Sequence, residues 1–154
     1  MYQFLHSEAV VEQHVSCWPE CRGSFLADSL EHRSNSFPHS TFNWVGLDGS
    51  QILTHMTPVN EYNAQADVDE VRRGQTGNKN LEVTSQAVIL FGNGDGGGGP
   101  TPPMLEKLRR TRAVVQCGQA TSTDLPLVKM GGSFDRFFES LKEETANGTK
   151  LPNW

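Results

Sequence analysis

The alternation of apolar and polar positions predicts a β-hairpin in the first half of the chain. Residues 41–45 (TFNWV) alternate between apolar and polar side chains, as expected of a half-buried strand, and residues 51–56 (QILTHM) supply a return strand. Between them, Asp48-Gly49 is a strong turn pair, because glycine accepts the positive φ that tight hairpin turns need. The sequence therefore predicts a hairpin over residues 37–56.

A continuous apolar run at residues 86–91 (QAVILF) predicts a strand that is buried on both faces, as in a parallel sheet. It leads into a glycine-rich stretch at residues 92–100 (GNGDGGGGP). Thr101 can then cap a helix, and Pro102 stands in its first turn, where the missing N–H costs nothing. This order of strand, loop and helix is typical of α/β folds, whose functional residues gather in such loops.

Two more helices are predicted around this unit. Residues 66–73 permit a short helix that Gly74 or a following glycine would end. Residues 133–146 form a clearer one, with Ser133 as the N-cap and Gly148 closing the C-terminus. Its apolar positions have helical spacing and predict core packing: Phe134, Phe137, Phe138 and Leu141.

Residues 1–33 show little periodicity, and we leave this segment unassigned, as a poorly ordered or misassigned terminus. Zinc ligands are present by residue type at His14, Cys17, Cys21 and His32. Their spacing matches no standard zinc finger, so we predict no metal site from them.

The charge balance excludes some classes of protein. The chain has 13 Lys and Arg against 18 Asp and Glu, a net charge of −5, which disfavours a phosphate-binding nucleic-acid surface. No apolar run reaches the roughly 18 residues that span a bilayer, and no secretory signal is visible. Three cysteines, an odd number, fit a reducing compartment. We therefore expect no nucleic-acid or membrane partner.

The glycine-rich stretch admits more than one interpretation. Gly92, Gly94 and Gly97 satisfy a dinucleotide-binding pattern, but the carboxylate of Asp95 would repel phosphates, and Asp124 lies too far along to hold a ribose. Alternatively, the glycines present the Asp95 carboxyl group to a substrate as a general acid or base. A third interpretation is that Asp95 only accepts hydrogen bonds from its own loop.

Several separate motifs occur in an order that resembles the α-mannosidases of glycoside hydrolase family 38, in the cytosolic or vacuolar branch without a signal peptide. They are TFNWVGLDGS at 41–50, THMTP at 54–58, FGNGDGGGGP at 91–100 and MGGSFDRFF at 130–138. The resemblance covers residues 34–154. It implies an α/β fold, namely an incomplete part of a seven-stranded α/β barrel, and a cytoplasmic or vacuolar location.

The resemblance also implies roles for individual residues. Asp95 matches the acid/base loop, and Tyr62 matches a tyrosine that lines the sugar site. Asn63 follows it, at a position that is often acidic in the family. His55 receives no role, and we interpret it as a hydrogen-bonded histidine at the end of a strand.

The family hydrolyses terminal α-D-mannosides with retention, using zinc and an aspartate nucleophile. Both the nucleophile and the zinc ligands match positions outside this sequence. We therefore expect the parent enzyme to act on a mannoside or oligosaccharide substrate. A homo-oligomeric parent is left open. The isolated chain is expected to be inactive and metal-free. One alternative is that the chain is a non-catalytic binding or regulatory remnant of such an enzyme. A second alternative is a dinucleotide-binding module.

Overall fold

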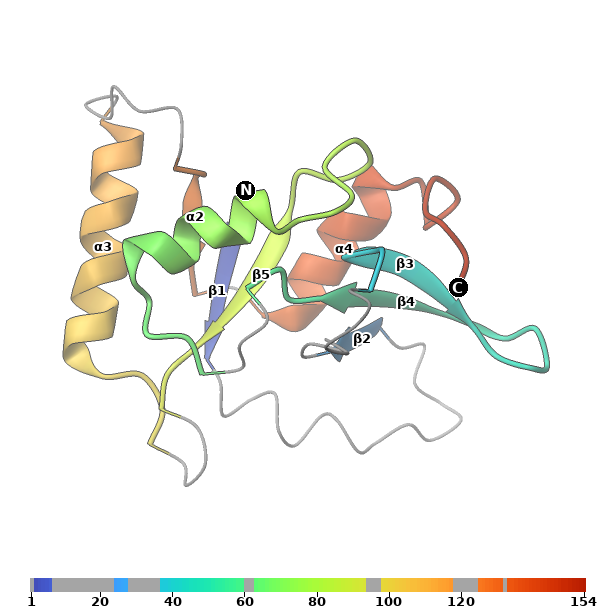
Figure 1. Cartoon of the computed structure of the whole chain (residues 1–154), viewed down its shortest axis with the longest axis horizontal. Helices are drawn as coiled ribbons and strands as arrows, with labels where there is room; N and C mark the ends of the chain where they lie inside the picture. The colour runs from blue at the N-terminus through green and yellow to red at the C-terminus, as the bar shows by residue number, and fades with distance from the viewer. Residues whose placement is uncertain are drawn as a thin grey trace.

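The structure is a computed structural model of the 154-residue chain, shown in Figure 1. It describes residues 2–6, 24–27, 37–59, 63–93, 98–117, 125–131 and 133–154. In chain order the elements are β1 (Tyr2–His6), β2 (Ser24–Ala27), β3 (Thr41–Val45), β4 (Gln51–Met56), α2 (Val68–Thr76), β5 (Ala87–Phe91), α3 (Pro102–Gln116), β6 (Val128–Met130) and α4 (Phe134–Glu144). The mixed α/β class that the sequence predicts is confirmed.

A parallel three-stranded sheet, in the order β5-β1-β6, forms the centre of the described fold. The side chains of β5 alternate between two cores. Ala87, Ile89 and Phe91 share one core with residues of α2 and α3, whereas Val88 and Leu90 share the other with residues of α4. All five are at most 5% exposed. The predicted strand with two buried faces is therefore confirmed, and the helices lie on both sides of the sheet (Figure 1).

The second sheet has the order β2-β4-β3, with β2 parallel and β3 antiparallel to β4. The predicted hairpin is confirmed, and Thr41 pairs with His55. A five-residue connection closes it, where Gly46 N donates to Ser50 O at 2.7 Å and Gly49 has a φ of +82°. The other edge of β3 is covered by residues 152–154, which run parallel to it.

Helix α2 begins later than the sequence predicts, at Val68 instead of residue 66. The reason is Ala66, whose φ of +60° is incompatible with a right-handed helix. The helix also runs past Gly74 to Thr76, and Gly77 is its C-cap. A Cβ atom at Gly77 would collide with the carbonyl oxygen of Pro58, so the close approach of these two segments requires glycine there.

Helix α4 ends at Glu144, two residues before the predicted end. Ala146, Asn147 and Gly148 all have positive φ, so the chain leaves the helix through a left-handed stretch and not through Gly148 alone. The N-terminal prediction is confirmed, since the Ser133 hydroxyl accepts a hydrogen bond from Arg136 N at 3.3 Å.

Two strands, β1 and β2, come from the first 33 residues, for which the sequence pattern predicts no element. The backbone of β1 pairs with β5 along its whole length, with Tyr2 opposite Ala87 and His6 opposite Phe91. None of the helices that the structure describes is long and apolar enough to cross a bilayer.

Candidate active site

The predicted site residues border two stretches of chain that meet at the carboxyl end of β5. Tyr62 and Asn63 directly precede Ala64, and Asp95 comes soon after β5 in the sequence. Asn63 is described and half-buried, whereas Tyr62 and Asp95 lie outside the described residues. The described chain nevertheless runs up to both of them, through Asn63 on one side and through Asn93 and Gly98 on the other. The positions of Asn63, Asn93 and Gly98 therefore locate the candidate site.

Ala64 joins the two stretches. Its N–H donates to Leu90 O at 3.1 Å, and its carbonyl oxygen accepts from Gly92 N at 3.0 Å. Ala64 thus forms a parallel bridge with Phe91, as a short additional strand would. The residue before it, Asn63, is therefore held at the same edge of the sheet as the start of the glycine-rich stretch. In α/β folds this carboxyl edge is where functional loops gather.

The glycine-rich stretch is closed at its base by a pair of backbone hydrogen bonds. Asn93 N donates to Gly99 O at 2.8 Å, and Gly99 N donates to Asn93 O at 2.9 Å. Gly92 and Gly99 have φ of +126° and +60°, and a Cβ atom at Gly98 would lie 3.0 Å from Asn93 Cβ. Glycine accommodates the positive φ at Gly92 and Gly99, and at Gly98 it leaves room for the close approach of Asn93. These residues, 92–93 and 98–99, form a glycine neck that fixes the two ends of the segment that contains Asp95.

This neck does not fit a dinucleotide fingerprint well. In that motif the glycine loop leads directly into the helix, so that the pyrophosphate meets the helix N-terminus. Here the chain first returns to pair with Asn93, and α3 begins only at Pro102. Thr101 occupies the predicted N-cap position, and its N–H lies 3.4 Å from Met104 Sδ.

His55 is part of the fold, as the sequence interpretation proposes. Its ring is fully buried, and both nitrogens have partners: Nε2 accepts from Val88 N at 3.2 Å, and Nδ1 lies 2.9 Å from Thr41 Oγ1. Because Nε2 accepts, the neutral ring carries its proton on Nδ1 and donates it to Thr41. Burial lowers the pKa of His55 to about 3. The histidine thus links β4 to β5 and has no lone pair left for another role.

We expect His55 to make the fold acid-sensitive. A histidine pKa of about 3 in the folded chain lies below the ordinary value of 6.5, so the unfolded chain binds the proton first as the pH falls. The stabilisation is complete above pH 6.5 and decreases by up to about 1.4 kcal/mol per pH unit below it. Urea unfolding at pH 7, 6 and 5 measures this slope. In His55→Gln, which keeps a donor and an acceptor but does not titrate, the slope should become flatter; an unchanged slope would assign the acid sensitivity to other groups.

Glu144, at the end of α4, fixes the start of β5. Its carboxylate accepts hydrogen bonds from Thr84 Oγ1 at 2.8 Å, from Ser85 N at 2.9 Å and from Gln86 Nε2 at 2.8 Å. Burial raises the pKa of Glu144, but these hydrogen bonds together outweigh it, and the net shift is downward. The carboxylate therefore remains charged and holds β5 in register with the helix behind it.

The sequence analysis missed Glu70, a buried carboxylate beside the candidate site. It stands three residues after Asp67, the N-cap of α2. The spacing D-x-x-E just before a helix resembles a capping box, so the signal was present in the sequence. Its two hydrogen bonds reach backbone N–H groups in the stretch that follows Asn63.

The described residues do not fit the zinc ion that the family resemblance implies. Among residues with described placement, no group of three or more His, Cys, Asp or Glu side chains could hold a metal ion. The ring nitrogens of the buried His55 are both engaged. We derive no chemical step through a metal from these residues.

The described residues form a parallel sheet with helices on both faces, and the glycine-rich stretch begins at the carboxyl end of β5. Comparison with known proteins makes this specific. The sequence profile of the Glycosyl hydrolases family 38 N-terminal domain matches residues 23–154, and the chain belongs to this family.

Its relatives include proteins named as α-mannosidases. The chain is 43% identical over 131 residues to Alpha-mannosidase of Saccharomyces cerevisiae, which covers 84% of this chain and 12% of the yeast protein. It is 54% identical over 86 residues to Alpha-mannosidase G of Dictyostelium discoideum, covering 55% and 8%. For Alpha-mannosidase 2C1 of Mus musculus the identity is 51% over 87 residues, covering 56% and 8%. The chain thus spans only a small part of the length of these relatives.

Proposed function

We propose that this chain is the acid/base segment of a retaining α-mannosidase, and that Asp95 is the general acid/base. The observation that carries this proposal is the Ala64 bridge, which anchors the stretches leading to Tyr62 and to Asp95 at one edge of the sheet. Family membership and the names of the relatives support the reaction class. The substrate is a terminal α-D-mannoside, free or at the end of an oligosaccharide.

The chemistry requires two carboxyl groups. The Asp95 carboxyl group donates its proton to the glycosidic oxygen as the bond to the mannose carbon breaks, while a nucleophilic carboxylate forms a glycosyl-enzyme bond. Asp95 then removes a proton from the water that hydrolyses this intermediate. Tyr62 and Asn63 contact the sugar. The nucleophile and the zinc ion belong to parts of the parent enzyme outside this chain, and residues 34–154 form part of its seven-stranded barrel.

The location of the parent enzyme follows the branch of the family that the motifs resemble. We propose the cytoplasm or the vacuole. The net charge of −5 gives no support for binding to nucleic acid or to an anionic membrane surface.

The test uses the full-length parent enzyme and the isolated chain side by side. With a nitrophenyl α-D-mannoside the parent should release the sugar, and proton NMR should show the α-anomer as the first product, because double displacement retains the configuration. The isolated chain should give no turnover, with or without zinc, because it supplies one carboxyl group of the two. Turnover by the isolated chain, or a first product with inverted configuration, would contradict the proposal. A parent that cleaves no mannoside would favour the non-catalytic remnant instead.

A further inference from the structure

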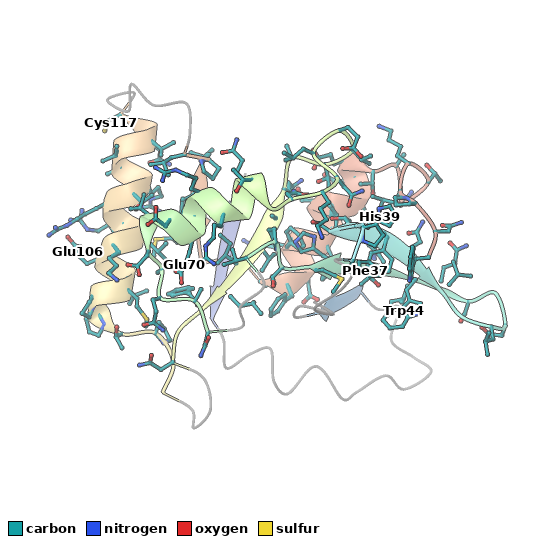
Figure 2. The ribbon with its side chains drawn as sticks, viewed as in Figure 1. Phe37, His39, Trp44, Glu70, Glu106 and Cys117 are labelled. Atoms are coloured by element: carbon teal, nitrogen blue, oxygen red, sulfur yellow. The ribbon has the colours of Figure 1, made fainter. Side chains whose placement is uncertain are left out.

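Glu70 makes two hydrogen bonds to backbone on either side of a strained residue. It is the third residue of α2, and its side chain is buried, with 5% of the residue exposed. Oε1 accepts from Gln65 N at 2.9 Å, and Oε2 accepts from Asp67 N at 2.8 Å. Figure 2 shows Glu70 projecting from α2 among the neighbouring side chains. One carboxylate therefore binds two backbone N–H groups that are separated by a single residue, Ala66.

Ala66 adopts a conformation that alanine rarely takes. Its φ is +60°, in the left-handed region where the Cβ atom is crowded by backbone. The residue is fully buried and belongs to the core cluster between the sheet, α2 and α3. Neither a side-chain hydrogen bond nor glycine-like freedom is available at Ala66 to stabilise this turn. The two bonds to Glu70 hold the residues before and after it, and so fix the turn from outside.

The turn connects the candidate site to α2. On its N-terminal side, Ala64 is bonded to Leu90 and Gly92 at the end of β5, and the Gln65 side chain donates to Asn63 O at 3.0 Å. The chain of contacts therefore runs from Glu70 through Gln65 to Ala64, and from there to Asn63 and the glycine neck. A movement of the turn would displace Asn63 relative to β5.

Helix capping alone does not account for both bonds. In a capping box the glutamate at the third helical position accepts from the N–H of the N-cap residue, here Asp67. The bond from Gln65 N lies two residues further back, outside the helix. A negative charge near the helix N-terminus would also be favourable by itself, but any carboxylate at this position would provide it.

We propose that Glu70 is a positioning residue for mannoside binding. Through the Ala66 turn it holds Asn63 at the sugar. This inference rests on the proposed function, because the stretch matters only if it contacts a mannoside there. Glu70 itself touches no substrate. Its loss should therefore weaken sugar binding in the ground state and the transition state alike, which raises KM and leaves kcat nearly unchanged.

The experiment uses four variants of the full-length parent enzyme and a nitrophenyl α-D-mannoside. Glu70→Gln is nearly isosteric, but its amide accepts from one N–H and turns a donor toward the other. Glu70→Asp keeps the charge but is one methylene too short to reach both N–H groups. Ala66→Gly is combined with Glu70→Gln, because glycine adopts the positive φ without the bonds. Asp69→Asn is the matched control, since Asp69 is the preceding residue in the same helical turn and pairs only on the surface with Arg72, at 3.1 Å.

We expect KM to rise roughly tenfold in Glu70→Gln and in Glu70→Asp, with kcat within threefold of wild type, because small displacements of a substrate-positioning group have effects of this size or larger. Adding Ala66→Gly to Glu70→Gln should bring KM most of the way back to the wild-type value, and Asp69→Asn should leave both KM and kcat unchanged. The inference is overturned if Glu70→Gln matches the Asp69→Asn control, if Glu70→Asp behaves as wild type, or if Ala66→Gly restores nothing.

A parallel Asp95→Asn variant separates this inference from the function on which it rests. Should Asp95→Asn retain the wild-type kcat/KM on a mannoside that releases an alcohol, which needs the proton, the proposed acid/base is wrong, whatever Glu70 does. Should Asp95→Asn lose activity while Glu70→Gln matches the Asp69 control, the function stands and the positioning role is wrong. Thermal unfolding of each variant identifies any rise in KM that merely follows a loss of folded protein. A change in KM that tracks the melting temperature across all variants would also overturn the inference.

Discussion

Asp95→Asn in the full-length parent enzyme is expected to lower kcat/KM for an unactivated mannoside by about 10²–10⁴-fold, the usual contribution of a general acid or base. Asparagine has nearly the shape of aspartate and keeps one oxygen that can accept hydrogen bonds from the loop, but it cannot donate a carboxyl proton to the departing oxygen. The change therefore removes the proton transfer and leaves the glycine neck, from Asn93 to Gly99, intact. Steady-state hydrolysis of a mannose disaccharide measures the effect.

The control for this change is again Asp69→Asn. Asp69 loses the same charge but lies exposed on α2, with 85% of its side chain accessible. We expect its rates to stay within twofold of wild type. If Asp95→Asn also stays within a few-fold of wild type, Asp95 is not the acid/base, and the interpretation that it only accepts hydrogen bonds from its own loop would be favoured.

Phe137→Ala is expected to have the largest effect on stability, about 3–5 kcal/mol of the free energy of unfolding. Phe137 is fully buried in α4, beneath β5. Its ring packs edge-on against His55, with centroids 5.0 Å apart, and against Phe138 at 5.2 Å. Removing it opens a cavity under the histidine that links β4 to β5, so both sheets lose a shared contact.

Phe134→Ala is the matched control for this prediction. Phe134 stands one turn earlier in α4 and is only partly buried against the same core. Because less apolar area returns to water, we expect a cost of about 1–2 kcal/mol. Urea denaturation of the chain, followed by circular dichroism, gives both values. Equal losses in the two variants would contradict the packing described for α4.

Local sequence patterns were sufficient for the elements whose signals are local. The run at 86–91 predicts a doubly buried strand because both of its faces must meet apolar side chains, and the hairpin follows from alternation and a turn pair. Helix α4 follows from its phenylalanine spacing. In each case a few neighbouring residues carry the information.

The features that sequence reasoning missed depend on residues far apart in the chain. Nothing near β1 indicates that it lies between β5 and β6, because parallel pairing joins distant segments. The buried Asn80 is a second example: its side chain accepts from Ser40 N at 2.7 Å and from Thr41 N at 3.0 Å. Such bonds leave no periodic signal.

The candidate site also combines features with a local sequence signal and features that depend on distant residues. The glycine-rich stretch and its aspartate are evident from the sequence, whereas the Ala64 bridge, which places Asn63 near the start of that stretch at Gly92, is not. The late start of α2 depends on one alanine with positive φ, which no propensity predicts. Glu70 carried a capping signal, but its second bond, to Gln65 N, is visible only in the structure.

The central claim is that the carboxyl group of Asp95 donates a proton to the glycosidic oxygen of the leaving group. It is tested most directly by measuring kcat/KM of Asp95→Asn and of wild type on two mannosides, one that releases a dinitrophenolate and one that releases an alcohol. A dinitrophenolate leaves without protonation, so kcat/KM of the variant, which reports the bond-breaking step, should stay close to the wild-type value on this substrate. On the second substrate it should fall by about 10²-fold or more. An equal loss on both substrates would contradict the account.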